Sequence, residues 1–407
     1  MNEIEKPPIP TAPIQSEENR SPAIETTRPM PAPASIRRIL VIAYGHIGDV
    51  LPAGPALRAV RETYPQARIT MLAMAQVQEM MAACPYLDEF IVLKDTKHQL
   101  GSFGGKIERV FQFIQLVPRL YRHFDLVLNF HINIRATTLL GWLTGARVRA
   151  GIPAINLPRM VTHRARPLTA TSSYADVNRH VLEAIGITTM PTGLELWPTP
   201  ADEQAVQALL DEHGIAANDV LIGLHPGTHW TCQQWSPKDW ATIADHLVSR
   251  YHARLIISGS EDEHALARAI SDHMTVNDAR PIDLTGRTSF LQFAALVRRL
   301  NLLICVNSSA PKVALAMKTP TLNLVGYESP TWYLPPIHSE PMTIIRGCDD
   351  ASAVEHWCPY NIWGTTNGCH RAECMGIGGL SLITPAMVLR QIERRLKTRQ
   401  AAQASQP

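Results

Sequence analysis

Apolar residues along this chain alternate between short continuous runs and positions with helical spacing. From Arg37 onward the runs are "RRILVIA", "RITMLAM", "EFIVL" and "FDLVLNF", and each predicts a buried β-strand. Between the first two runs, Leu57, Val60 and Tyr64 fall on one face of a predicted helix. Further helices are expected near 105–123, 136–144 and 174–186. Strands that alternate with helices predict a parallel sheet covered on both faces.

The same alternation restarts after residues 187–201, which carry three prolines and indicate a domain boundary. The later strand-like runs are "VLIGLHPG", "ARLIISGS", "LLICVNSS" and "PTLNLVG". We therefore expect an α/β protein with two doubly wound, Rossmann-like parallel-sheet domains. Such sheets bind ligands at the carboxyl ends of their strands, so the crevice between the two domains is the expected site.

Residues 1–36 are rich in proline, serine, threonine and charged residues and are expected to form a disordered tail. The remaining boundaries are an N-terminal domain at 37–200, a C-terminal domain at 201–382 and a final helix at 383–398.

The bulk composition excludes several classes of protein. A formal net charge of only +2 over 407 residues does not suggest a nucleic-acid binder. No apolar run reaches the roughly 18 residues that a membrane span needs, and no signal peptide opens the chain. Seven cysteines in a chain of this length do not make a disulfide scaffold. The protein is expected to be soluble and cytoplasmic.

The loop after the first strand, "YGHIGDVLP", has the position of a phosphate-binding turn but carries a carboxylate. Gly45, His46 and Gly48 lead to Asp49, whose negative charge would repel a phosphate. Two interpretations are open: Asp49 caps the following helix, or it acts on a ligand in the crevice.

Loops of the second domain carry polar residues that suit an anion. Asn307, Ser308 and Ser309 lie between a strand and a helix expected to begin near Ala310, where backbone N–H groups and the helix dipole favour negative charge. Ordinary helix capping is the alternative. In the preceding strand-to-helix segment, Ser236 is expected to cap a helix that begins at Pro237.

Four stretches together resemble the family 9 glycosyltransferases, typified by the ADP-heptose lipopolysaccharide heptosyltransferases. They are "ILVIAYGHIGDVLPAGPALRAVRETYPQARI", "FDLVLNFHINIRATTLLGWLTGARVRAGI", "IGLHPGTHWTCQQWSPKDW" and "DLTGRTSFLQFAALVRRLNLLICVNSSAPKVALAMKTPTLNLVG". Each stretch alone is a weak signal. Their order is that of the family, and the likeness covers roughly residues 37 to 398.

The resemblance implies a GT-B architecture, with the acceptor on the first domain, the nucleotide-sugar on the second, and the final helix crossing back onto the first. It implies an inverting sugar transfer that needs no metal or other cofactor, with Asp49 in the place of the general base. The implied acceptor-side loop consists of Gly45, His46, Gly48 and Arg135. The implied donor-binding residues are Thr228, His229, Gln233, Glu263, Asn307, Ser308, Ser309 and Lys312.

The implied partners are a nucleotide-sugar donor, most simply ADP-heptose, and a lipopolysaccharide core or other glycan acceptor, with peripheral contact to the inner face of the membrane. A protein acceptor is an alternative. A nicotinamide-dependent enzyme is a third hypothesis, but G-x-G-x-x-G is missing.

Departures from the family pattern leave a further alternative, a member that binds nucleotide-sugar without turnover. The usual Asp-Thr/Ser-Gly-Pro-Met-His of the donor loop is replaced by residues 307–312, so an acidic sugar contact becomes Asn307 and a glycine becomes Ser309. Gln233 replaces a basic residue. Lys312 adds a cation in the first turn of a helix, where the dipole disfavours it. It either neutralises a bound diphosphate or extends to solvent.

The late cysteines Cys348, Cys358, Cys369 and Cys374 lack the paired C-x2-C of strong zinc signatures. The resemblance extends to protein-modifying heptosyltransferases with a four-cysteine iron site in a comparable place. Both reduced thiols and a structural iron or zinc site therefore remain open.

Overall fold

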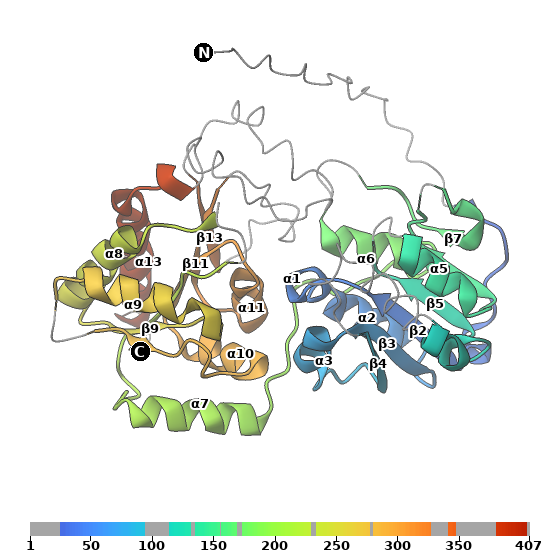
Figure 1. The fold of residues 1–407 in the computed structure, drawn as a ribbon, viewed down its shortest axis with the longest axis horizontal. Helices are drawn as coiled ribbons and strands as arrows, with labels where there is room; N and C mark the ends of the chain where they lie inside the picture. The colour runs from blue at the N-terminus through green and yellow to red at the C-terminus, as the bar shows by residue number, and fades with distance from the viewer. Residues whose placement is uncertain are drawn as a thin grey trace, which may run out of the picture.

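The structure is a computed structural model in which the chain forms two α/β domains lying side by side (Figure 1). It describes residues 25–93, 114–131, 135–154, 156–168, 173–228, 233–276, 280–326, 341–346 and 380–404.

The N-terminal domain is built on a sheet with the strand order β1-β7-β6-β5-β2-β3-β4. All of its strand pairs are parallel except β1 with β7. The strands are β1 (Glu25–Thr26), β2 (Arg38–Ala43), β3 (Arg68–Met74), β4 (Glu89–Leu93), β5 (Leu126–Asn129), β6 (Val148–Gly151) and β7 (His163–Arg164).

Helices cover both faces of this sheet. The side chains of α2 (Ala53–Thr63), α3 (Ala75–Met81) and α6 (Tyr174–Glu183) join one apolar cluster. Those of helix 114–120 and α5 (Arg135–Leu143) join a second cluster against the other face. The short elements η1 (Pro33–Ser35), α1 (Ile47–Val50) and η3 (Pro158–Met160) lie in connections.

The C-terminal domain has a parallel sheet with the order β10-β9-β8-β11-β12-β13. Its strands are β8 (Leu221–His225), β9 (Arg254–Ile257), β10 (Ile282–Asp283), β11 (Leu302–Val306), β12 (Thr321–Val325) and β13 (Met342–Arg346). Side chains of α8 (Pro237–Tyr251), α9 (His264–His273) and α13 (Pro385–Ala404) pack on one face. Those of α7 (Pro200–Glu212), α10 (Phe290–Arg299) and α11 (Ala310–Met317) pack on the other, while η5 (Glu261–Glu263) and η8 (Leu380–Leu382) are short turns.

The predicted fold class of two doubly wound, Rossmann-like domains is therefore confirmed. The two predicted helix starts are also confirmed. Ser236 accepts a hydrogen bond from the Asp239 N–H at the start of α8, and α11 begins at Ala310.

The expected disordered tail is wrong for residues 25–36. The Thr27 N–H donates to the Thr162 carbonyl at 2.9 Å, β1 pairs with the edge strand β7, and Ile36 is buried. Backbone hydrogen bonds to a sheet edge order this segment, and composition does not report them.

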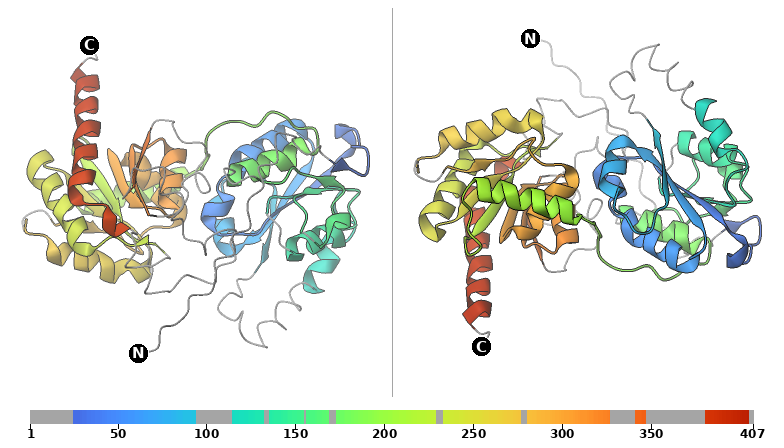
Figure 2. Two further views of the ribbon diagram at one scale, coloured as in Figure 1. Left: turned by 90° about the horizontal axis from the view of Figure 1, so that it is seen from above. Right: turned by 90° about the horizontal axis from the view of Figure 1, so that it is seen from below.

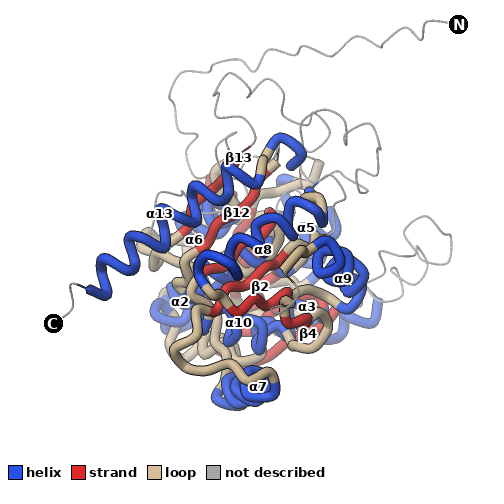
Figure 3. The backbone as a smooth tube through the Cα atoms, turned by 90° about the vertical axis from the view of Figure 1, so that its left-hand side faces the viewer, coloured by secondary structure: helices blue, strands red, loops and turns tan. Residues whose placement is uncertain are grey.

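The expected crossing of the final helix to the N-terminal domain is also wrong. Helix α13 packs on α8 and β12 of the C-terminal domain, as Figures 2 and 3 show. Val388 and Ile392, four residues apart, are fully buried in that domain's core, and the Arg395 guanidinium donates to Thr343 Oγ1 on β13. The apolar face of α13 is thus buried against its own domain.

Contacts between α3 and α10 join the two domains. A carboxylate oxygen of Glu79 accepts from the Phe290 N–H at 2.9 Å, so a side chain of one domain caps the first turn of α10 in the other. One apolar cluster runs through both domains at this boundary. The loops that follow β2 and β11 are thereby held close together.

Candidate active site

The 45–49 loop leaves the carboxyl end of β2 and enters α1, which places Asp49 in the first helical turn. The Asp49 Oδ2 atom accepts from the His46 N–H at 3.1 Å. A Cβ atom at Gly45 would lie 3.0 Å from Asp49 Cβ, so glycine makes room for this carboxylate. The capping contact is therefore present. It engages one oxygen, and a carboxylate has a second that can accept a proton.

Lys312 reaches this loop from the other domain. Its side chain is 1% exposed, and its ammonium Nζ donates to the Gly48 carbonyl at 2.5 Å. A Cβ atom at Gly48 would lie 3.3 Å from Nζ, which makes glycine the residue best suited to this approach. Of the two alternatives for Lys312, extension to solvent is contradicted, because the domain boundary buries the side chain. The charge-assisted hydrogen bond to Gly48 offsets the unfavourable position at a helix N-terminus.

The amide groups at the start of α11 are mostly committed within the chain. The Ala310 N–H bonds Ser308 Oγ at 3.3 Å, Pro311 has no N–H, and the Lys312 N–H bonds the Ser309 carbonyl at 3.1 Å. Ser309 has φ −73°, so its side chain introduces no left-handed strain. Asn307 is buried just before it. An anion bound at this end of α11 would therefore be held by side chains more than by backbone amides.

Thr228 and Gln233 meet at the carboxyl end of β8. Gln233 is buried, and its Oε1 accepts from the Thr228 hydroxyl at 3.1 Å. This bond joins two residues five positions apart at that strand end. A neutral side chain suits this buried position, since an unpaired buried charge is costly.

Glu263 lies against the backbone that follows β8 and β9. Its Oε2 accepts from the Ser260 N–H at 2.7 Å, and a Cβ atom at Gly227 would lie 1.9 Å from its Oε1. Gly227 thus leaves room for a half-buried carboxylate near the carboxyl ends of β8 and β9. Capping of η5 is established for Glu263, and contact with a ribose hydroxyl stays a prediction.

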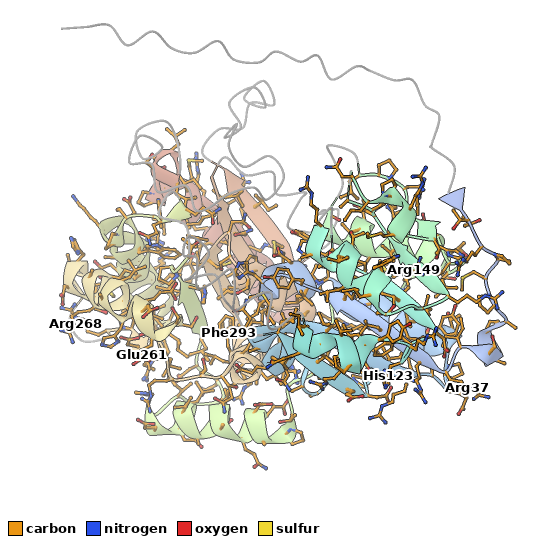
Figure 4. The ribbon with its side chains drawn as sticks, turned by 45° about the vertical axis from the view of Figure 1, so that its right-hand side comes forward. Arg37, His123, Arg149, Glu261, Arg268 and Phe293 are labelled. Atoms are coloured by element: carbon orange, nitrogen blue, oxygen red, sulfur yellow. The ribbon has the colours of Figure 1, made fainter. Side chains whose placement is uncertain are left out.

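His225 is a residue at this edge that sequence reasoning missed. It is the last residue of β8, its ring lies 5.1 Å from that of Phe293 (labelled in Figure 4), and its Nδ1 is 3.0 Å from Ser258 Oγ. Desolvation lowers the pKa of His225 to about 4, so its imidazole is neutral at pH 7. Its place at a strand end, directly before Pro-Gly, is the signal that could have identified it.

We predict that His225 makes the fold sensitive to mild acid. The imidazole of the unfolded chain protonates near its ordinary pKa of about 6.5, whereas the folded one resists protonation down to about 4. Stability should therefore fall as the pH drops from 6.5 towards 4. Between pH 7 and 5 this group should remove about 2 kcal/mol from the free energy of unfolding.

Urea unfolding of the wild type and His225→Gln at both pH values measures this contribution. The variant should lose about 2 kcal/mol less on acidification, while His273→Gln, at an exposed histidine, should behave as the wild type. Equal pH dependence in the wild type and His225→Gln would contradict the prediction.

The N-terminal domain contains two further groups near the 45–49 loop that the sequence did not single out, an aromatic pair and Gln76. Tyr44 precedes the 45–49 loop, and its ring centroid lies 6.1 Å from that of His131 at the end of β5. Gln76 on α3 bonds the His46 ring at 3.2 Å. Arg135, which the resemblance implied for the acceptor-side loop, is exposed at the start of α5, and its contact with an acceptor stays a prediction. Tyr44 directly follows β2 and His131 lies two residues after β5, so aromatic residues close to strand ends were the available signal.

Several predicted residues lie outside the described residues: His229 and the four cysteines Cys348, Cys358, Cys369 and Cys374. Within the described ranges no group of three or more His, Cys, Asp or Glu side chains could hold a metal ion. Cys84 and Cys305 are free and buried. No helix among the described residues is long and apolar enough to span a membrane.

Comparison with known proteins identifies the family. The profile of "Glycosyltransferase family 9 (heptosyltransferase)" matches residues 114–360, more than half of the chain. Lipopolysaccharide heptosyltransferase 3 of Escherichia coli K12 is 24% identical over 300 residues, which cover 71% of this chain and 82% of that protein.

Two solved structures share the fold. The family 9 glycosyl transferase of Veillonella parvula has a TM-score of 0.72 and 23% identity, covering 89% of this chain and 97% of that one. The E. coli heptosyltransferase WaaC with ADP has a TM-score of 0.64 and 14% identity, covering 88% and 99%. The chain therefore belongs to glycosyltransferase family 9 and is a glycosyltransferase of GT-B architecture.

Proposed function

We propose that this enzyme transfers a heptose, with inversion, from ADP-heptose to a lipopolysaccharide core or related glycan. The observation that carries the proposal is the meeting of the Asp49 loop with Lys312 across the domain boundary. This contact brings a carboxylate and a cation from different domains to one place. The heptosyltransferase relative and the ADP in the WaaC structure support this choice of donor.

In this proposal Asp49 is the general base. Its carboxylate takes the proton of the acceptor hydroxyl while that oxygen attacks the anomeric carbon from the face opposite the diphosphate. The bond between the anomeric carbon and the diphosphate oxygen breaks, and its electron pair leaves with ADP. The positive character that develops on the sugar ring tolerates the nearby carboxylate. The hydrogen bond from His46 fixes the orientation of Asp49.

Lys312 has two tasks in the proposed reaction. Its bond to Gly48 keeps the residue before Asp49 against the donor-side helix, and its ammonium stabilises the charge that develops on the departing diphosphate. With most of the first amides of α11 committed and Gln233 neutral, this lysine supplies the cation that the donor loop otherwise lacks.

A direct test combines donor binding with product analysis. Calorimetric titration should show that ADP binds more tightly than UDP or GDP. ADP-heptose with a heptose-containing core acceptor should give a product heavier by one heptose in mass spectra. ADP binding without any transfer would favour the alternative of a non-catalytic member, which the neutral Asn307 and Gln233 motivate. Failure to bind any nucleotide would contradict both.

A further inference from the structure

A hollow of about 300 Å³ lies in the N-terminal domain, at the amino ends of its central strands. Arg38, Arg68 and Glu89, which line it, are the first residues of β2, β3 and β4. The Asp49 loop follows the opposite end of β2, a strand of six residues that spans about 20 Å. A ligand in this hollow would therefore leave the proposed transfer site open.

The floor of the hollow is formed by one face of the sheet and by the segment that leads into β5. Thr70 and Ile91 are each 3% exposed, and Phe124 is partly buried. Helix 114–120 covers this sheet face, because its Leu120 belongs to the same apolar cluster as Ile91, with Phe124 packed against that cluster. The floor thus offers a hydroxyl group, an aliphatic side chain and an aromatic ring on packed elements.

Basic side chains surround this floor. Arg38 and Arg68 occupy paired positions on β2 and β3, so they leave neighbouring strands on the same face of the sheet. Arg119 lies in the last turn of helix 114–120, and His123 follows that helix. A basic residue suits the end of a helix, which accounts for Arg119 but not for the two arginines on the strands. Like charges placed so close repel each other unless an anion lies between them.

The lining carries more positive than negative charge. Glu89 pairs with Arg68 at 3.1 Å, so three guanidinium groups in the lining face one carboxylate. The nearby Asp125 is engaged elsewhere, because its Oδ2 accepts from the backbone N–H groups of Arg37 and Arg38 at 2.8 and 2.9 Å. Figure 4 labels Arg37 at this end of the N-terminal domain. The hollow is therefore suited to an anion.

We propose that this hollow binds a small soluble organic phosphate, a phosphate ester that carries one ring. Guanidinium groups match phosphate oxygens with paired hydrogen bonds, and the Phe124 ring offers a surface for the organic part. The volume suits one small molecule, because ligand pockets begin at about 300 Å³. The site is separate from the transfer site and does not depend on which sugar is transferred.

Calorimetric titration of the full chain with phenyl phosphate tests the proposal. ADP at saturation first fills the proposed donor site, so the heat reports on the remaining sites. Phenyl phosphate should bind, and more tightly than inorganic phosphate. Arg38→Gln with Arg119→Gln should weaken its binding by about tenfold or more. Phe124→Leu should remove most of the preference over inorganic phosphate while leaving the affinity for inorganic phosphate unchanged.

Matched controls lie on the C-terminal domain. Arg250→Gln with Arg268→Gln alters two exposed arginines, one of them labelled in Figure 4, and should leave phenyl phosphate binding unchanged. Lys312→Met, titrated without ADP, should bind phenyl phosphate as the ADP-saturated wild type does. This arm tests the hollow even if the proposed donor site binds no nucleotide.

Thermal unfolding followed by circular dichroism checks that each variant folds. If the double variant with Arg38→Gln does not fold, Arg119→Gln alone, at an exposed residue, should still weaken binding. Three results would overturn the proposal: no binding of phenyl phosphate at millimolar concentration, an equal loss of binding in both arginine pairs, or no preference for phenyl phosphate over inorganic phosphate.

Discussion

Asp49→Asn should lower the rate of sugar transfer by about 10² to 10⁴ while leaving ADP affinity nearly unchanged. The amide keeps the size of the side chain, and its oxygen can still accept from the His46 N–H that Asp49 engages at 3.1 Å. It cannot take a proton from the acceptor hydroxyl. The nucleotide is proposed to bind the other domain. Steady-state kinetics should therefore show the loss of turnover, while calorimetry should show an ADP affinity close to that of the wild type.

A second capping aspartate supplies the control. Asp202 accepts from the Thr199 N–H at 2.8 Å in the first turn of α7, as Asp49 does from His46 in α1. Asp202→Asn should therefore share any small loss of stability but keep full transfer activity. If Asp49→Asn retained wild-type turnover, or lost ADP binding together with activity, the assignment of the base would fail.

Much of the fold could be predicted because its central strands are buried on both faces. The runs around β2, β3, β5, β8, β9, β11 and β12 are apolar almost throughout, which is the pattern of a covered parallel sheet. Strands β1, β7 and β10 have two residues each, too few for any periodicity to appear. They exist because a neighbouring edge offers hydrogen bonds. Composition predicted disorder for residues 25–36 for the same reason, because it does not report the hydrogen bonds that this segment makes to the sheet edge.

Loops of the site could be located from sequence, but their contacts could not. Strand ends, glycines and helix caps are local signals, and they identified the loops of Asp49, Thr228 and Asn307. The bond between Lys312 and Gly48 joins residues 264 positions apart and exists only because the domains pack through α3 and α10. The lowered pKa of His225 likewise depends on burial that only the assembled domain creates. Sequence reasoning could therefore name the two alternatives for Lys312 without choosing between them.

Replacement of Lys312 by methionine should weaken ADP binding by about 1 to 3 kcal/mol and make that binding less sensitive to salt. Methionine retains an unbranched apolar side chain in a position that is 1% exposed, but it removes the charge. The Gly48 carbonyl loses its donor at the same time, so the orientation of Asp49 should loosen and turnover should fall as well. Calorimetry at several salt concentrations, together with initial rates, separates the two effects.

Lys318 offers a matched control on the same helix. It is exposed at the C-terminal end of α11 and has a left-handed φ of 59° that lysine and methionine tolerate equally. Lys318→Met removes one positive charge from the same element, so it corrects for the change in net charge, and both affinity and turnover should stay close to wild type. Should Lys312→Met bind ADP as tightly as the wild type while turning over slowly, the lysine would only hold the 45–49 loop in place. Unchanged affinity and unchanged turnover would remove Lys312 from the site and leave the departing diphosphate without the cation proposed for it.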